Sequence, residues 1–91
     1  MKPFNPKLTM IETKIRTTDI VAEENGKRVG RLEFTLVNNE MTIIHTTAYE
    51  SGRGIGSLLM RNAVAWADAH RYKIIPFCSF AKKYLETIGH K

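Results

Sequence analysis

The hydrophobic pattern of this chain changes its period once, and the change falls at a loop that contains three glycines. Before the loop, apolar and polar residues alternate, as Leu32 and Phe34 show within residues 31–36. After the loop, apolar residues recur every three or four positions from Ile55 to Ala67. Alternation is typical of half-buried strands, whereas the longer period is typical of an amphipathic helix. The chain is therefore expected to pack a sheet against a helix.

The expected elements follow one another in the order β-β-β-α-β-α. We expect three strands, a long helix, a fourth strand and a short C-terminal helix, at residues 19–23, 31–36, 41–47, 55–70, 74–77 and 79–88. The Asn25-Gly26 pair predicts a tight hairpin turn, and Ser79 is expected to cap the last helix. A long helix between two strands usually makes those strands parallel. The predicted fold class is α/β (α+β with a mixed sheet), an antiparallel meander followed by a crossover helix.

Length and composition restrict the number of domains, the partners and the location that we expect for this chain. Ninety-one residues make one domain, which we place at 10–91 behind a flexible arm at 1–9. The formal net charge of +5 favours an anionic partner without choosing among nucleic acid, acidic protein and a phosphorylated small molecule. No apolar run approaches the roughly 18–20 residues of a membrane span, so no membrane partner is expected. The absence of a secretory signal and the single cysteine predict a cytoplasmic location, and no residue cluster has metal-ligand spacing, so no metal is expected.

The most informative segment is the glycine loop, residues 51–57, between the third strand and the long helix. Gly52, Gly54 and Gly56 free the backbone to turn sharply and to approach a ligand closely. The first N–H groups of the following helix have no internal partner, and the helix dipole adds partial positive charge, so a phosphate suits this position. Arg53 adds a full positive charge beside it. The spacing fits neither the dinucleotide pattern nor the Walker pattern, so a pyrophosphate site and a tight turn without a ligand both stay open.

A second unusual segment begins at Pro76. Proline cannot donate to a sheet ladder, so we expect the fourth strand to be splayed from its neighbour here, which leaves a slot. Cys78 then lies at the slot just before a helix, where a thiol gains nucleophilicity; the alternative is a small buried apolar cysteine. Tyr84 is a candidate acid for a leaving thiolate, and His45 is a candidate base for an incoming amine. Ordinary packing and a structural histidine are the alternatives for these two.

The loop Gly52-Arg53-Gly54-Ile55-Gly56 and the later segment Ile75-Pro76-Phe77-Cys78-Ser79-Phe80-Ala81-Lys82-Lys83-Tyr84 together resemble the minimal GCN5-related N-acetyltransferases (GNAT superfamily) with a Pro-x-Cys-x-Phe segment. The resemblance covers residues 19–86 and implies a small GNAT-like fold with acetyl-CoA as cosubstrate. It implies Gly52, Arg53, Gly54, Ile55, Gly56 and Ser57 as backbone ligands of the CoA pyrophosphate, Thr47 and Ala48 as partners of the pantetheine arm, and Cys78 as the catalytic residue at the thioester. Ser51 departs from the family pattern, which usually has Arg or Gln at this position.

The sequence therefore predicts an acetyl-CoA-dependent N-acetyltransferase that acts on an amine, with a protein or peptide lysine as one candidate acceptor. The hairpin-length link between the strands at 19–23 and 31–36 leaves the acceptor side open. Two mechanisms stay open: direct attack by the amine, with Cys78 or Tyr84 protonating the thiolate, and transfer through an acetylated Cys78. A CoA-binding or sensing domain without turnover is the alternative function, and a small basic nucleic-acid-binding domain is a third. A monomer or weak dimer is expected.

Overall fold

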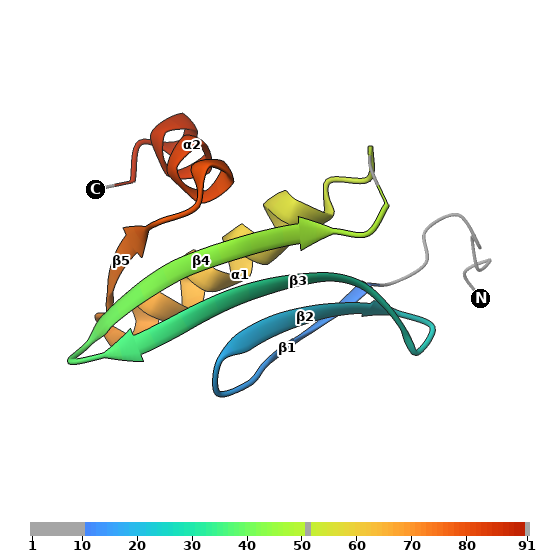
Figure 1. Ribbon diagram of the computed structural model, residues 1–91, viewed down its shortest axis with the longest axis horizontal. Helices are drawn as coiled ribbons and strands as arrows, with labels where there is room; N and C mark the ends of the chain where they lie inside the picture. Colours follow the sequence, from blue (N-terminus) through green and yellow to red (C-terminus); the bar gives the residue numbers. More distant parts are fainter. Residues whose placement is uncertain (1–10, 51, 91) are drawn as a thin grey trace, which may run out of the picture.

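The computed structural model describes residues 11–50 and 52–90, so the expected arm at 1–9 lies outside the described residues. The elements in chain order are β1 (Ile11–Ile15), β2 (Asp19–Glu24), β3 (Lys27–Val37), β4 (Glu40–Ala48), α1 (Ile55–His70), β5 (Lys73–Pro76) and α2 (Ser79–Ile88). The strands form one sheet in the order β1-β2-β3-β4-β5, and all neighbours are antiparallel except the parallel pair β4 and β5 (Figure 1). The predicted mixed sheet with a crossover helix is confirmed.

The apolar stripe of α1 packs against one face of the sheet, behind it in the view of Figure 1. The sheet contributes buried side chains such as Leu32 and Phe34, each worth about 1.5–3 kcal/mol on leaving water. Gly30 of β3 lets the start of α1 come close, because a Cβ there would lie 2.5 Å from Cγ2 of Ile55. The start of α1, which follows the glycine loop, is thereby fixed against β3. Within the described segments, neither helix is long and apolar enough to cross a membrane.

The first strand, β1, was not expected from the sequence, so the order is β-β-β-β-α-β-α. It pairs with β2 along its whole length. Thr13 in its centre donates a hydrogen bond of 3.0 Å to Oδ1 of Asn62. Asn62 is the one polar residue in the apolar stripe of α1, and Thr13 accounts for its presence there. The strand is short and polar, and it depends on partners that are distant in the sequence.

The opposite face of the sheet carries a charged cluster, made of Arg16, Asp19, Arg31 and Glu33. Asp19 is only 2% exposed, and its carboxylate accepts hydrogen bonds from Arg16 at 2.7 and 2.8 Å and from Arg31 at 2.6 Å. The hydrogen bonds from Arg16, together with those from Arg31, hold the pKa of Asp19 well below its usual range, although burial acts in the other direction. Arg31 also pairs with Glu33 at 2.6 Å. The charged cluster thus stabilises this face through charge-assisted hydrogen bonds, whereas apolar packing stabilises the α1 face.

A β-bulge in β4 changes which of its side chains face α1. In the register with β3, Ile44 is left without a partner of its own. Ile43 before the bulge is buried on the α1 side, and Thr46 after it lies on the same side. Side chains alternate within a regular strand. His45 and Thr47 therefore lie on the opposite face, with the charged cluster.

The parallel strands β4 and β5 separate at Pro76. Their pairing ends at Ile43 opposite Pro76, although β4 continues to Ala48. The N–H groups of Phe77 and Cys78 both donate to the carbonyl of Ile43, at 3.0 and 3.1 Å. Beyond this carbonyl, no described strand borders β4 on this side, and a slot is left between β4 and α2. The predicted splay is confirmed, whereas Phe77, which was expected within the strand, lies beyond its end.

Candidate functional site

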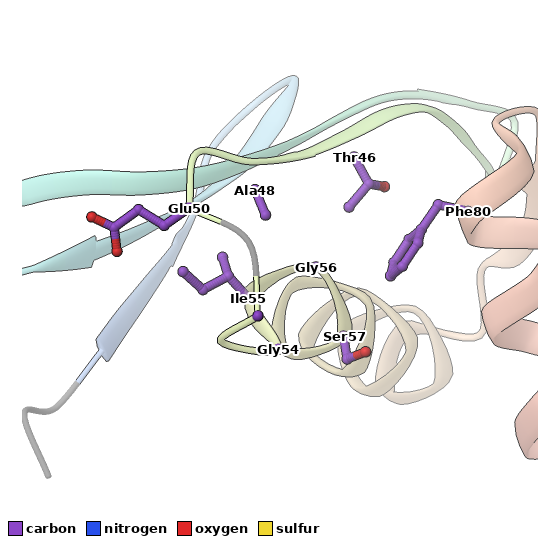
Figure 2. Close-up of a pocket in the computed structure, with 9 residues that line it drawn as sticks. Thr46, Ala48, Glu50, Gly54, Ile55, Gly56, Ser57 and Phe80 are labelled. Atoms are coloured by element: carbon purple, nitrogen blue, oxygen red, sulfur yellow. The ribbon is translucent and has the colours of Figure 1, made fainter.

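The first pocket lies beside the slot, at the start of α1 (Figure 2). It has a volume of about 300 Å³ and is lined by β4, the glycine loop, the first turn of α1 and one residue of α2. The lining residues are Thr46, Ala48, Glu50, Gly52, Gly54, Ile55, Gly56, Ser57 and Phe80. The glycine loop and the slot, which the sequence marks separately, therefore belong to one site.

The backbone of the glycine loop leaves the hydrogen-bond donors at the start of α1 without a partner among the residues that the structure describes. Gly52 and Gly54 have φ values of 80° and 72°, which glycine adopts without strain. Gly54 is the N-cap, and its carbonyl accepts the N–H of Leu58 at 3.0 Å. No side-chain hydrogen bond caps the helix at Gly54, so the N–H groups of its first turn have no intrahelical partner. Together with the helix dipole, these groups form a place for a phosphate.

The space beside the glycine loop also suits a ligand. A Cβ added at Gly52 or Gly54 would meet no other heavy atom within 4 Å. Both glycines also line the first pocket. A ligand can thus come into contact with the bare backbone.

The side chain of Arg53 contacts carboxylates and does not line the first pocket. Its guanidinium donates to Glu24 at 2.7 and 2.8 Å and to Glu50 at 2.9 Å. This pairing, with Glu24 first, raises the pKa of Arg53, and it lowers the pKa of Glu24. The positive charge that Arg53 adds beside the loop is therefore paired with two carboxylates, and the role of its backbone amide stays a prediction. Ser51, the departure from the family pattern, lies outside the described residues.

Cys78 lies at the slot as the N-cap of α2. Its Sγ accepts the backbone N–H of Ala81 at 3.3 Å, so the thiol has the capping position that was expected for Ser79. The same Sγ is 3.7 Å from Oγ1 of Thr46, across the slot on β4. The residue is half-buried. Cys78 thus contacts a residue of the first pocket and also packs against the core, so its catalytic role stays a prediction beside the packing alternative.

Phe80 separates the first pocket from a second one. Its ring packs against the first turn of α1, where a Cβ on Gly56 would come within 2.9 Å of Cζ (Figure 2). The second pocket has a volume of about 260 Å³ and is lined by Ser57, Phe80, Lys83, Tyr84 and Thr87. Ser57 and Phe80 line both pockets, so the two are direct neighbours.

The structure brings together most of the residues implied for CoA and separates the candidate acid and base. The implied residues that line the first pocket are Ala48, Gly52, Gly54, Ile55, Gly56 and Ser57. Tyr84 lines the second pocket, and His45 lies on the opposite face of the sheet with Thr47. Thr46 lines the first pocket and Thr47 does not, because the bulge shifts the alternation that the sequence suggests for this strand. The consecutive apolar pair Ile43-Ile44, which interrupts the alternation, is the signal that could have revealed it.

Comparison with known proteins identifies a family. A family model described as GCN5-related N-acetyl-transferase matches residues 19–89. The chain is similar to the solution structure of a GCN5-like protein from Staphylococcus aureus that is proposed to be an N-acetyltransferase. The two are 30% identical, the match covers 85% of this chain and 79% of that one, and the TM-score is 0.69. No curated protein matches the chain.

Two longer proteins share the fold. A protein from Pyrococcus furiosus, proposed to be an acetyl transferase, is 28% identical over 80% of this chain and 58% of its own, with a TM-score of 0.59. The aminoglycoside N-acetyltransferase AAC(6')-Iy, solved in complex with CoA, is 13% identical over 80% of this chain and 59% of its own, also with a TM-score of 0.59. At that identity, the likeness to the aminoglycoside enzyme is one of fold alone.

Proposed function

This chain belongs to the GCN5-related N-acetyltransferase family, and we propose that it transfers the acetyl group of acetyl-CoA to the nitrogen of an amine. The observation that carries the proposal is one pocket that extends from the first turn of α1 at Gly54 to Thr46 on β4. Cys78 lies beside the Thr46 end, with its Sγ 3.7 Å from Oγ1 of Thr46. When bound, acetyl-CoA supplies an acetyl group activated as a thioester. A ligand with a pyrophosphate and a distant thioester suits a pocket with these two ends.

The backbone of β4 is proposed to pair with the amides of the pantetheine arm. The N–H of Tyr49 donates to the carbonyl of Val29 on β3 at 2.9 Å. Backbone groups of alternate residues in a strand point to the same side, so those of Thr47 also face β3. Those of Thr46 and Ala48 face the slot, where the arm would complete the pairing. The contact implied for Thr47 is thereby reassigned to Thr46.

The transfer makes one bond and breaks another. The amine nitrogen bonds to the thioester carbonyl carbon, and the bond from that carbon to sulfur breaks. The nitrogen loses a proton, and the departing thiolate takes one up. Cys78 is the proposed donor of that proton because it lies beside the first pocket, whereas Tyr84 lines the second. In the alternative route, Cys78 takes the acetyl group as a thioester and then passes it to the amine.

The acceptor amine is proposed to approach from the sheet face that bears the charged cluster. Both helices join the core on the other face, where the first pocket would hold acetyl-CoA. His45 is exposed and lies on the acceptor face opposite Glu33 in the register, so it is the candidate to take the proton of the amine. Only the Asn25-Gly26 turn joins β2 to β3, so no helix is inserted between these strands to cover this face. A lysine side chain of a protein or peptide suits such an approach.

Thermal unfolding with acetyl-CoA tests the proposed ligand. At about 100 times its Kd, acetyl-CoA should raise the free energy of unfolding by roughly 2.7 kcal/mol. For a domain of this size, we expect the Tm to rise on the order of ten degrees. ATP and a short DNA duplex are the controls, and equal shifts with either would contradict the assignment. Release of free CoA thiol in the presence of amines then separates a transferase from a CoA-binding domain without turnover.

Gly54→Ala is expected to weaken CoA binding more than it weakens the fold. A φ of 72° costs an alanine about 1 kcal/mol. The added methyl group would stand on a residue that lines the first pocket, beside the proposed pyrophosphate position. Gly26→Ala is the matched control, because Gly26 has a φ of 80° and equally open surroundings in the β2–β3 turn. Titration calorimetry should show at least about a tenfold loss of CoA affinity for Gly54→Ala alone. Equal affinities in the two variants would refute the proposed pyrophosphate position.

A further inference from the structure

The second pocket presents a cation that the first pocket lacks. Of the described residues that line the two pockets, Lys83 alone carries a positive charge, and Glu50 in the first pocket carries a negative one. The guanidinium of Arg53 is held by Glu24 and Glu50. Lys83 forms no ion pair with any described carboxylate. Its ammonium group is therefore free for an anion in the second pocket.

The place of this pocket next to the glycine loop suggests which anion it takes. CoA carries a 3′-phosphate on its adenosine in addition to the pyrophosphate. Ser57 lies in the first turn of α1 and lines both pockets, so the second pocket begins beside the proposed pyrophosphate position. The side chains of Phe80 and Tyr84 line this pocket, and aromatic rings suit the flat adenine. Thr87 donates its hydroxyl proton to the carbonyl of Lys83 at 2.9 Å, so this hydroxyl is already used. Ser57 and Tyr84 offer neutral hydroxyl donors, and the ammonium of Lys83 is the cationic donor among the described lining residues.

We propose that Lys83 binds the 3′-phosphate of CoA in the second pocket and makes the protein select CoA over 3′-dephospho-CoA. The inference rests on the proposed function, because it places the pyrophosphate at the glycine loop. An ammonium group binds a phosphate through charge-assisted hydrogen bonds. Lys83 is exposed, so solvent and salt reduce this contribution, and the effect on affinity is moderate.

The test compares two nucleotides and four proteins. Titration calorimetry gives the Kd values of CoA and 3′-dephospho-CoA for the wild type, Lys83→Met, Lys83→Arg and Lys82→Met. Methionine keeps an unbranched apolar side chain but removes the charge, and arginine restores a charge. Lys82 is the matched control because it is the neighbouring exposed lysine and lines neither pocket. The Kd of dephospho-CoA reports in each variant whether the rest of the site is intact.

We expect the wild type to bind CoA about tenfold more tightly than dephospho-CoA. Lys83→Met should bind both nucleotides with the dephospho-CoA affinity, while Lys83→Arg and Lys82→Met keep the preference. Equal affinities in the wild type, or a preference that survives Lys83→Met, would overturn the role of Lys83 and leave the proposed function standing. If the wild type binds neither nucleotide, the proposed function fails, and the inference fails with it.

Discussion

Cys78→Ser should lower the rate of acetyl transfer by at least about 100-fold while CoA affinity and stability stay close to wild type. A serine hydroxyl is a poorer acid and a poorer nucleophile than a thiol, so both routes through Cys78 are slowed. Serine is also a good N-cap, so the hydrogen bond from the N–H of Ala81 is kept. Cys78→Ala removes this cap as well, and should lower the free energy of unfolding by a further amount of about 1 kcal/mol.

The rates are measured as release of CoA thiol with an amine acceptor, and affinities by titration calorimetry. Cys78 is the only cysteine of the chain, so an acetyl thioester found by mass spectrometry after an acid quench can be assigned to it. Such an adduct supports the acetylated-cysteine route, and its absence during turnover supports direct attack. An undiminished transfer rate in Cys78→Ser would rule out both roles of the thiol.

Asp19→Asn is expected to cause a large loss of stability, about 2–4 kcal/mol at pH 7. The carboxylate of Asp19 is 2% exposed and accepts three hydrogen bonds from Arg16 and Arg31. An amide accepts fewer of these bonds and removes the shared counter-charge, so that Arg16 loses its partner and Arg31 keeps only Glu33. For a domain of this size, the Tm should fall by roughly 10 °C or more. Urea unfolding measures the difference, and Asp68→Asn, at an exposed carboxylate, is the control.

The same variant gives a pH dependence with a definite sign. The pKa of Asp19 is lower in the folded state than its ordinary value of 3.8, so the charged carboxylate favours folding. This contribution is fully present above the unfolded pKa and is lost as the pH falls below it toward the folded pKa. The stability gap between wild type and Asp19→Asn should therefore be constant from pH 7 to about 5 and shrink below about 4. A gap that is unchanged at pH 3 would contradict the assignment.

The sequence predicts the glycine loop and the splay between β4 and β5 because glycine and proline act on their own backbone. Gly54 has the positive φ that a glycine loop permits, and Pro76 ends the pairing of β5 with β4. The periods of the apolar residues likewise place the inner strands and α1, since a buried face requires such a pattern. Local chemistry of this kind is visible without knowledge of the fold.

Features that depend on residues far apart in the sequence could not be predicted. Thr13 of β1 finds its partner Asn62 49 residues later, and Arg53 finds Glu24 29 residues earlier. The bulge at Ile44 changes which later side chains of β4 face the helix, because one added residue shifts the alternation. Thr46 thereby takes the position that simple alternation gives to Thr47. Neither an ion pair nor a bulge is fixed by the residues on either side of it.

The carbonyl of Ile43 is the point at which the chain stays attached to β4 after the two strands separate. The segment that joins β5 to α2 is attached to β4 through the N–H groups of Phe77 and Cys78, which share this single acceptor. α2 is therefore held against β4 at its start, by these hydrogen bonds and by the 3.7 Å contact between Sγ of Cys78 and Oγ1 of Thr46. Its angle is set by the seating of Ala81 and Leu85 in the core, where they are 0% and 7% exposed. Substitutions that loosen this seating should widen the slot, and so change what it can hold, without altering any residue that lines the first pocket.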